Sequence, residues 1–214
     1  IAARYGLETV DGVDPLHLER YAAWMEKASG VERTGYTETV PPLENGGDIH
    51  EVNRGARPDP HLLGLLNVRY VAAEFPVQVA GLRRVARFGP TYLYENEHAL
   101  PRAFVVGRVE PVRDFEAALD WVESHDVSRA AAVEEGKALE SGEVRAEIQW
   151  VRRSPNQLLL NVTVDRCAFL VLSEVWYPGW RSEVDGRRVE LWRADGVLRG
   201  IYLGPGAHRV DLEY

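Results

Sequence analysis

The chain has 214 residues, with 33 acidic against 25 basic side chains and a formal net charge of -8. Its 45% hydrophobic and 27% charged content is typical of a folded protein and excludes wholesale disorder. Because an acidic surface does not neutralise phosphates, we expect no nucleic acid partner.

The sequence contains no stretch close to the roughly 18 to 20 uninterrupted apolar residues that span a bilayer. It begins at Ile1 without an initiator methionine. We therefore expect the chain to be part of a longer protein.

Residues 1–66 predict a helical and irregular N-terminal elaboration. Asp14 and Asp59 are each followed by a proline, which is typical of a helix start, and Gly30 is the expected end of the first helix. The segment 31–60 is rich in Gly, Pro, Asn and charge and predicts a long surface loop.

From residue 67 onward the sequence indicates strands, because short β-branched or aromatic runs alternate with Gly, Pro or Asn. The expected strands are 68–71, 82–88, 91–94, 103–106, 143–150, 157–164, 169–176, 181–184, 187–192, 197–203 and 207–214. One helix is expected near 114–122, where apolar residues share a face.

Two Asp-Gly pairs predict structural turns, Asp185-Gly186 as a two-residue hairpin and Asp195-Gly196 as a further turn. Short strands at regular spacing without alternating helices favour an antiparallel sheet arrangement. We predict an α+β, mainly β fold, in which residues 67–214 form an antiparallel β-sandwich, Ig-like or jelly-roll-like.

Recognisable chemistry motifs are absent from the sequence. It has no glycine-rich phosphate loop, no histidine pair at metal-ligand spacing and no Gly-x-Ser-x-Gly element. We therefore predict no cofactor, no metal site and no catalytic residue. The single cysteine, Cys167, is expected to be buried in a strand.

The aromatic cluster of Trp176, Tyr177 and Trp180 has two interpretations. These rings can form a stacking platform for a sugar, because aromatic faces cover the apolar faces of pyranoses. They can instead pack in the sandwich core, with Pro178-Gly179 turning the chain between strands.

Four groups of motifs in order resemble the extracytoplasmic tail of YfhO-like bacterial membrane proteins. They are residues 66–71, then 94–96 with 99–104, then 172–180 with 184–186, and finally 204–210 with Tyr214. The resemblance implies a parent protein with many transmembrane helices, similar to glycosyltransferases that use polyprenyl-phosphate sugars and associated with cell-envelope glycosylation.

By that resemblance the chain is a soluble C-terminal region at the extracytoplasmic face of the cell membrane, tethered by transmembrane helices. It would be a non-catalytic accessory domain, because the family's catalytic acidic residues lie in loops near N-terminal membrane helices. Its implied partners are the membrane region of its own parent protein and a glycan or lipid-linked sugar.

Two alternatives stay open. One is a carbohydrate-binding module that uses Trp176, Tyr177 and Trp180. The other is a hydrolase with a dispersed carboxylate pair drawn from residues such as Glu174, Glu183 and Asp185, which would need two carboxyl groups roughly 5 to 9.5 Å apart.

Overall fold

The computed structural model describes residues 4, 6–13, 18–33, 39–42 and 53–214, and it places them in two units, Ile1–Leu100 and Pro101–Tyr214. Strands account for 44% of the residues and helices for 15%, which confirms the predicted mainly β, α+β class.

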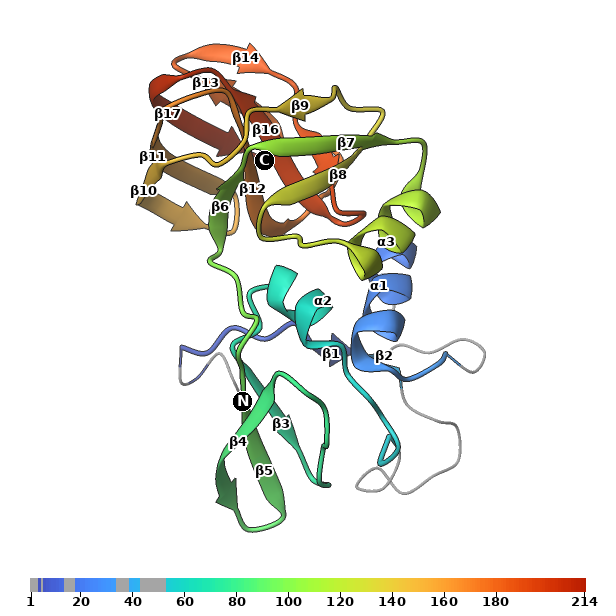
Figure 1. Ribbon diagram of the computed structural model, residues 1–214. Helices are drawn as coiled ribbons and strands as arrows, with labels where there is room; N and C mark the ends of the chain where they lie inside the picture. The colour runs from blue at the N-terminus through green and yellow to red at the C-terminus, as the bar shows by residue number, and fades with distance from the viewer. Residues whose placement is uncertain (1–3, 5, 14–17, 34–38, 43–52) are drawn as a thin grey trace. The chain divides into compact units, whose positions relative to one another are not determined.

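The first unit combines short helices with small sheets (Figure 1). Its helices are α1 (Glu19–Ser29) and α2 (Pro60–Leu65), and β1 (Gly12–Val13) pairs with β2 (Thr39–Val40). A three-stranded antiparallel sheet has the order β3-β5-β4 and consists of β3 (Tyr70–Ala73), β4 (Leu82–Phe88) and β5 (Thr91–Asn96).

The helix ends of the first unit follow from local chemistry. Asp59 caps α2, since its carboxylate accepts hydrogen bonds from the backbone N–H groups of His61 and Leu62 at 2.8 and 3.1 Å. Gly30 ends α1 in the left-handed region, at φ 69°. The other expected helix start, Asp14, and half of the expected loop lie outside the described residues.

A buried asparagine joins the three-stranded sheet to α2. The Asn96 side chain donates to the carbonyls of Pro60 and Val68, at 2.9 and 3.0 Å. Strands β3 to β5 therefore belong to the same unit as α2, and the chain divides after Leu100. This division differs from the boundary at residues 66 and 67 that we expected.

The second unit is built around two facing sheets (Figure 1). The five-stranded sheet has the order β10-β11-β17-β13-β14, with bounds Ala146–Ser154, Gln157–Val164, Gly206–Glu213, Arg181–Val184 and Arg187–Val189. The seven-stranded sheet has the order β6-β12-β16-β15-β8-β7-β9, with bounds Ala103–Val106, Ala168–Val175, Leu198–Leu203, Trp192–Ala194, Ala130–Glu134, Arg108–Val112 and Leu139–Glu140.

A hydrophobic cluster fills the space between these sheets. Leu158 and Leu160 of β11 meet Leu170 and Leu172 of β12 there, and each is at most 2% exposed. Because alternate strand residues point to opposite faces, this i, i+2 spacing directs one row from each sheet into the core. The packing is that of the predicted β-sandwich.

One pair of strands departs from the expected antiparallel pattern. Strands β7 and β8 run parallel, and α3 (Phe115–Ser124) connects them. The Asp114 side chain caps this helix by accepting a hydrogen bond from the N–H of Ala117 at 2.9 Å. A parallel pair needs such a crossover, so the helix that we expected near 114–122 is part of a β-α-β unit.

The expected strand 187–192 is divided between the two sheets. Strand β14 ends at Val189 in the five-stranded sheet, and β15 begins at Trp192 in the seven-stranded sheet. The chain therefore crosses from one layer to the other at Glu190 and Leu191. This crossing forms one side of the site described below.

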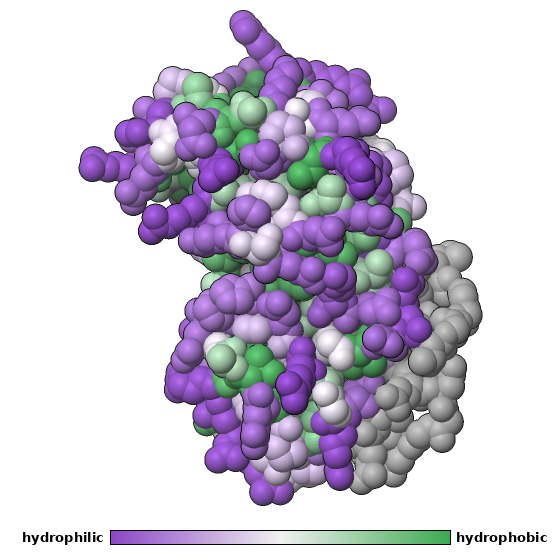
Figure 2. All heavy atoms as spheres, turned by 45° about the vertical axis from the view of Figure 1, so that its right-hand side comes forward, coloured by the Kyte–Doolittle hydropathy of each residue, from purple (hydrophilic) through white to green (hydrophobic). Residues whose placement is uncertain are grey.

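Hydrophilic side chains predominate on the face drawn in Figure 2, with hydrophobic groups scattered between them. Within the described residues, no helix combines the length and apolar character that crossing a membrane requires.

Candidate functional site

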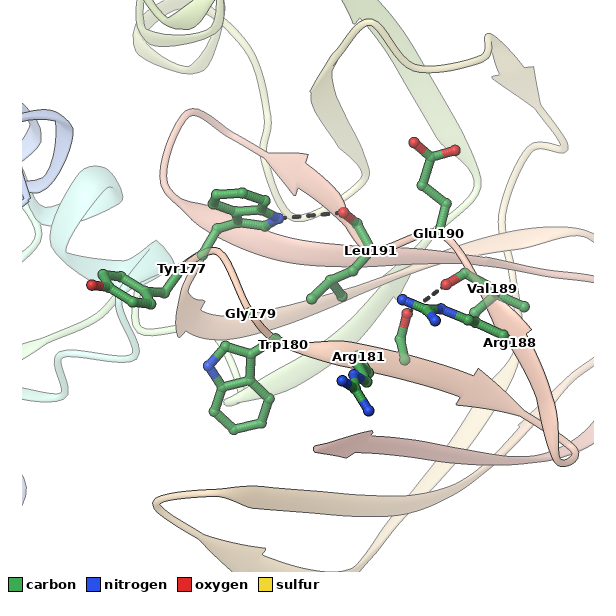
Figure 3. Close-up of a pocket in the computed structure, with 10 residues that line it drawn as sticks. Tyr177, Gly179, Trp180, Arg181, Arg188, Val189, Glu190 and Leu191 are labelled. Carbon is green, nitrogen blue, oxygen red and sulfur yellow. Dashed lines mark hydrogen bonds between the residues drawn. The ribbon is translucent and has the colours of Figure 1, made fainter. Parts of the chain in front are cut away.

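A pocket of about 210 Å³ lies beside the segment that joins β12 to β13 (Figure 3). Trp176, Tyr177 and Trp180 all contribute to its lining, together with residues from β13, β14 and the crossing after β14. Pockets for drug-sized ligands measure roughly 300 to 1,000 Å³. This pocket is therefore smaller than those that hold drug-sized ligands.

Gly179 shapes the loop that carries the aromatic residues. Its φ of 105° lies in the region that favours glycine. A Cβ at this position would lie 3.0 Å from the ring of Tyr214, so a larger residue here would push against that ring. The centroid of the Tyr214 ring lies 5.8 Å from that of Trp180 and 6.2 Å from that of Tyr177.

Trp176 is half-buried and held at two points. Its indole N–H donates to the carbonyl of Leu191 at 3.3 Å, the contact marked in Figure 3. The guanidinium of Arg193 lies over its ring, 3.9 Å from the centroid. One face of this indole is therefore occupied by a cation–π contact.

Trp180 takes part in both the core and the pocket. It packs against the hydrophobic cluster between the sheets and also lines the pocket. Arg199 lies over its ring, 3.8 Å from the centroid. One face of this indole is covered in the same way as that of Trp176. Trp180 therefore has features of both interpretations of the aromatic cluster, since it packs against the core and also lines the pocket.

Arg199 is a buried cation, only 5% exposed. Its Nε donates to the carbonyl of Val175 at 3.0 Å, whereas its Nη1 has no hydrogen-bond partner among the described residues. Burial lowers the pKa of Arg199 to about 10, opposed by the charge of Glu174. Glu174 itself forms an ion pair with Arg102, 2.8 Å from Nε to Oε1.

Asp185 and Gly186 form the two-residue turn between β13 and β14, with φ of 54° and 74°. The Asp185 carboxylate accepts hydrogen bonds from the N–H of Arg209 and from Nδ1 of His208, both at 2.8 Å. These contacts lower the pKa of Asp185 and raise that of His208. The side chain thus ties the hairpin to β17.

Asp195 and Gly196 form the turn between β15 and β16, with φ of 50° and 81°. Asp195 is fully buried, and its Oδ1 accepts a hydrogen bond from the N–H of Ala132 at 2.8 Å. Its Oδ2 has no partner among the described residues. Burial raises the pKa of this carboxyl to about 7, although the Ala132 N–H opposes the shift.

The carboxylates considered for hydrolysis do not gather at the pocket. Glu174, Glu183 and Asp185 are outside its lining, where Glu190 is the single acidic residue of the described part. Likewise, the described residues hold no group of three or more His, Cys, Asp or Glu suited to a metal ion.

The exposure of Cys167 differs from the sequence prediction, and the place of Tyr214 in the aromatic cluster was not predicted. Cys167 is exposed, not buried, because it lies in the loop just before β12 begins at Ala168. Tyr214 joins the aromatic cluster through the pairing of β17 with β13, which places Glu213 opposite Arg181. That register depends on contacts between distant segments, so no local pattern could reveal it.

Comparisons of the chain with protein-family models, curated proteins and solved structures find no significant match.

Proposed function

We propose that the chain is a non-catalytic accessory domain that binds a sugar in the pocket beside Tyr177. The observation that carries this proposal is the meeting of Trp176, Tyr177 and Trp180 at one pocket with polar neighbours. A sugar ring needs that combination, since its C–H faces are apolar and its hydroxyl groups require hydrogen bonds.

The aromatic residues supply apolar surface in fixed positions. Trp176 and Trp180 are each held on one face by an arginine, so little side-chain freedom is lost when a ligand contacts them. Tyr177 is 44% exposed and is the most accessible of the three. Its ring is therefore the one that a bound sugar would shield most.

Polar atoms at the pocket suit hydroxyl groups. The Ser182 hydroxyl donates to the carbonyl of Val189 at 2.8 Å, which leaves its oxygen able to accept a hydrogen bond. Glu190 adds an acceptor, and Arg188 adds donors. A sugar could exchange hydrogen bonds with these groups while its ring rests on an aromatic face.

The resemblance to the YfhO-like tail supports the placement of this sugar-binding role. It favours a domain at the extracytoplasmic face, next to the membrane region of its own parent protein, in envelope glycosylation. A full-length reading frame without a run of membrane helices would contradict this placement.

The test is a titration of the full 214-residue chain with methyl glucoside and N-acetylglucosamine, followed by NMR of the tryptophan indole N–H groups. We expect saturable shifts for two of the six tryptophans. Tyr177→Ala should weaken binding roughly three- to tenfold, the range expected for one aromatic contact.

Tyr70→Ala is the matched control, because Tyr70 is similarly exposed, at 49%, but lies on β3 of the first unit. It should bind as the parent does. Absence of any indole shift with either sugar would refute the proposal, as would equal losses in the two variants.

A further inference from the structure

The two arginines at the pocket lack carboxylate partners. Arg181 and Arg188 both line it, and neither side chain forms an ion pair or hydrogen bond with any residue that the structure describes. In the strand register Glu183 lies opposite Arg188, and Glu213 lies opposite Arg181. Neither of these two pairs forms an ion pair among the described residues.

The arginine side chains and the acidic lining residue point in different directions. In Figure 3 the Glu190 carboxylate points away from the guanidinium groups of Arg181 and Arg188. The lining therefore presents two cationic groups apart from its one carboxylate, in a chain whose net charge is -8.

A second layer of positive charge lies behind Trp180. Arg199 covers one face of the indole, with its Nη1 unpartnered among the described residues. Arg199 therefore places a buried positive charge against the indole that also lines the pocket.

From these contacts we infer that the pocket takes an anionic sugar, one that carries a phosphate or carboxylate group bound by Arg181 and Arg188. This inference rests on the proposed sugar-binding function and adds the chemical class of the ligand. The planar guanidinium group suits both anions, since it can donate two parallel hydrogen bonds to either.

The experiment compares four probes on the full chain: glucose 1-phosphate, glucuronic acid, methyl glucoside and inorganic phosphate. We expect the two anionic sugars to bind about tenfold or more tightly than methyl glucoside, the difference typical of hydrogen bonds to a charged group. Their affinity should fall as salt is added, whereas that of methyl glucoside should not.

A double variant, Arg181→Gln with Arg188→Gln, should remove the preference, so that the anionic sugars bind this variant no more tightly than methyl glucoside does. Arg187→Gln is the matched control, because Arg187 is exposed on the same strand but does not line the pocket. It should retain the preference.

The outcomes separate the two proposals. Equal affinity for neutral and anionic sugars would overturn the inference but leave the sugar-binding function standing, whereas no binding of any sugar would overturn both. Inorganic phosphate binding as tightly as glucose 1-phosphate would also overturn the inference, since the sugar would then play no part. Tighter binding of glucose 1-phosphate than of glucuronic acid would identify phosphate as the recognised group.

Discussion

The carboxyl group of Asp195 is enclosed at the turn between β15 and β16. It is fully buried, with a hydrogen bond to its Oδ1 and no partner for its Oδ2 among the described residues. Burial disfavours the charged form, and the pKa of the group rises from 3.8 to about 7. Folding is therefore linked to a proton on this side chain.

The expected consequence is a pH-dependent free energy of unfolding. Between about pH 4 and pH 7 the folded chain holds this proton more tightly than the unfolded chain, so the contribution of Asp195 is complete at low pH and is lost as the pH rises. Asp195→Asn should remove that dependence. At pH 8 it should raise the free energy of unfolding by up to about 4 kcal/mol relative to the parent.

Urea unfolding of both proteins at pH 5 and pH 8 measures this difference. Asp120→Asn, which changes an exposed carboxylate on α3, serves as the control and should keep the parent's pH dependence. If Asp195→Asn keeps it as well, Asp195 is not the group that binds the proton.

The contrast between Asp185 and Asp195 shows what turn chemistry predicts and what it does not. Both residues precede a glycine, and both adopt positive φ at a turn, as their sequence indicates. Asp185 is nevertheless exposed, while Asp195 is enclosed because Ala132 of β8 lies against its turn. Conformation is set locally, but burial depends on a strand that lies far away in the sequence.

On the scale of one element, Gly200 of β16 is a position where the core leaves no room. A Cβ there would collide with the ring of Phe169, which is fully buried on the neighbouring strand β12. Gly200→Ala should lower the free energy of unfolding by roughly 1 to 3 kcal/mol, the usual cost of overpacking. Chemical denaturation of the two proteins measures it.

Gly204, in the turn after β16, provides the control. Apart from Gly204 itself and its two chain neighbours, no residue has an atom within 4 Å of the Cβ that would be added there. Gly204→Ala should be neutral or should raise the free energy of unfolding by up to about 1 kcal/mol, because alanine reduces the conformational entropy of the unfolded chain. Equal stability of the Gly200→Ala variant and the parent would show that the Phe169 ring moves aside without cost.

Strands bounded by clear turns agree with the sequence, and strands defined by long-range pairing do not. The expected ranges 157–164 and 181–184 coincide with β11 and β13. Strand β8 was not expected, because its three alanines carry no β-branched signal. Its residues are strand only because β7 and β15 pair with them on either side.

The same reasoning applies to the candidate site. The sequence predicts Trp176, Tyr177 and Trp180 as a cluster because three aromatic residues fall within five positions. Glu190 and Leu191 reach the pocket because the chain crosses between the sheets after β14. No local pattern marks that crossing, since the run 187–192 reads as one strand.

On the scale of the whole molecule, the second unit contains all the elements of the sandwich. In the part of the chain that the structure describes, the buried cluster between its sheets consists of residues from 103 to 212. Domains of roughly 50 to 200 residues with a core of their own commonly fold alone. The unit Pro101–Tyr214 therefore has the size and the core that independent folding requires.

We expect the fragment 101–214 to unfold in one cooperative transition and to keep the NMR shifts that the Trp176 and Trp180 indoles show in the full chain. Leu160→Ala within the fragment should lower the free energy of unfolding by roughly 2 to 5 kcal/mol, because Leu160 is fully buried between the sheets. A loosely packed fragment would respond little to that substitution and would lose its structure gradually with denaturant. Such behaviour would mean that the sandwich needs residues before Pro101 in order to form.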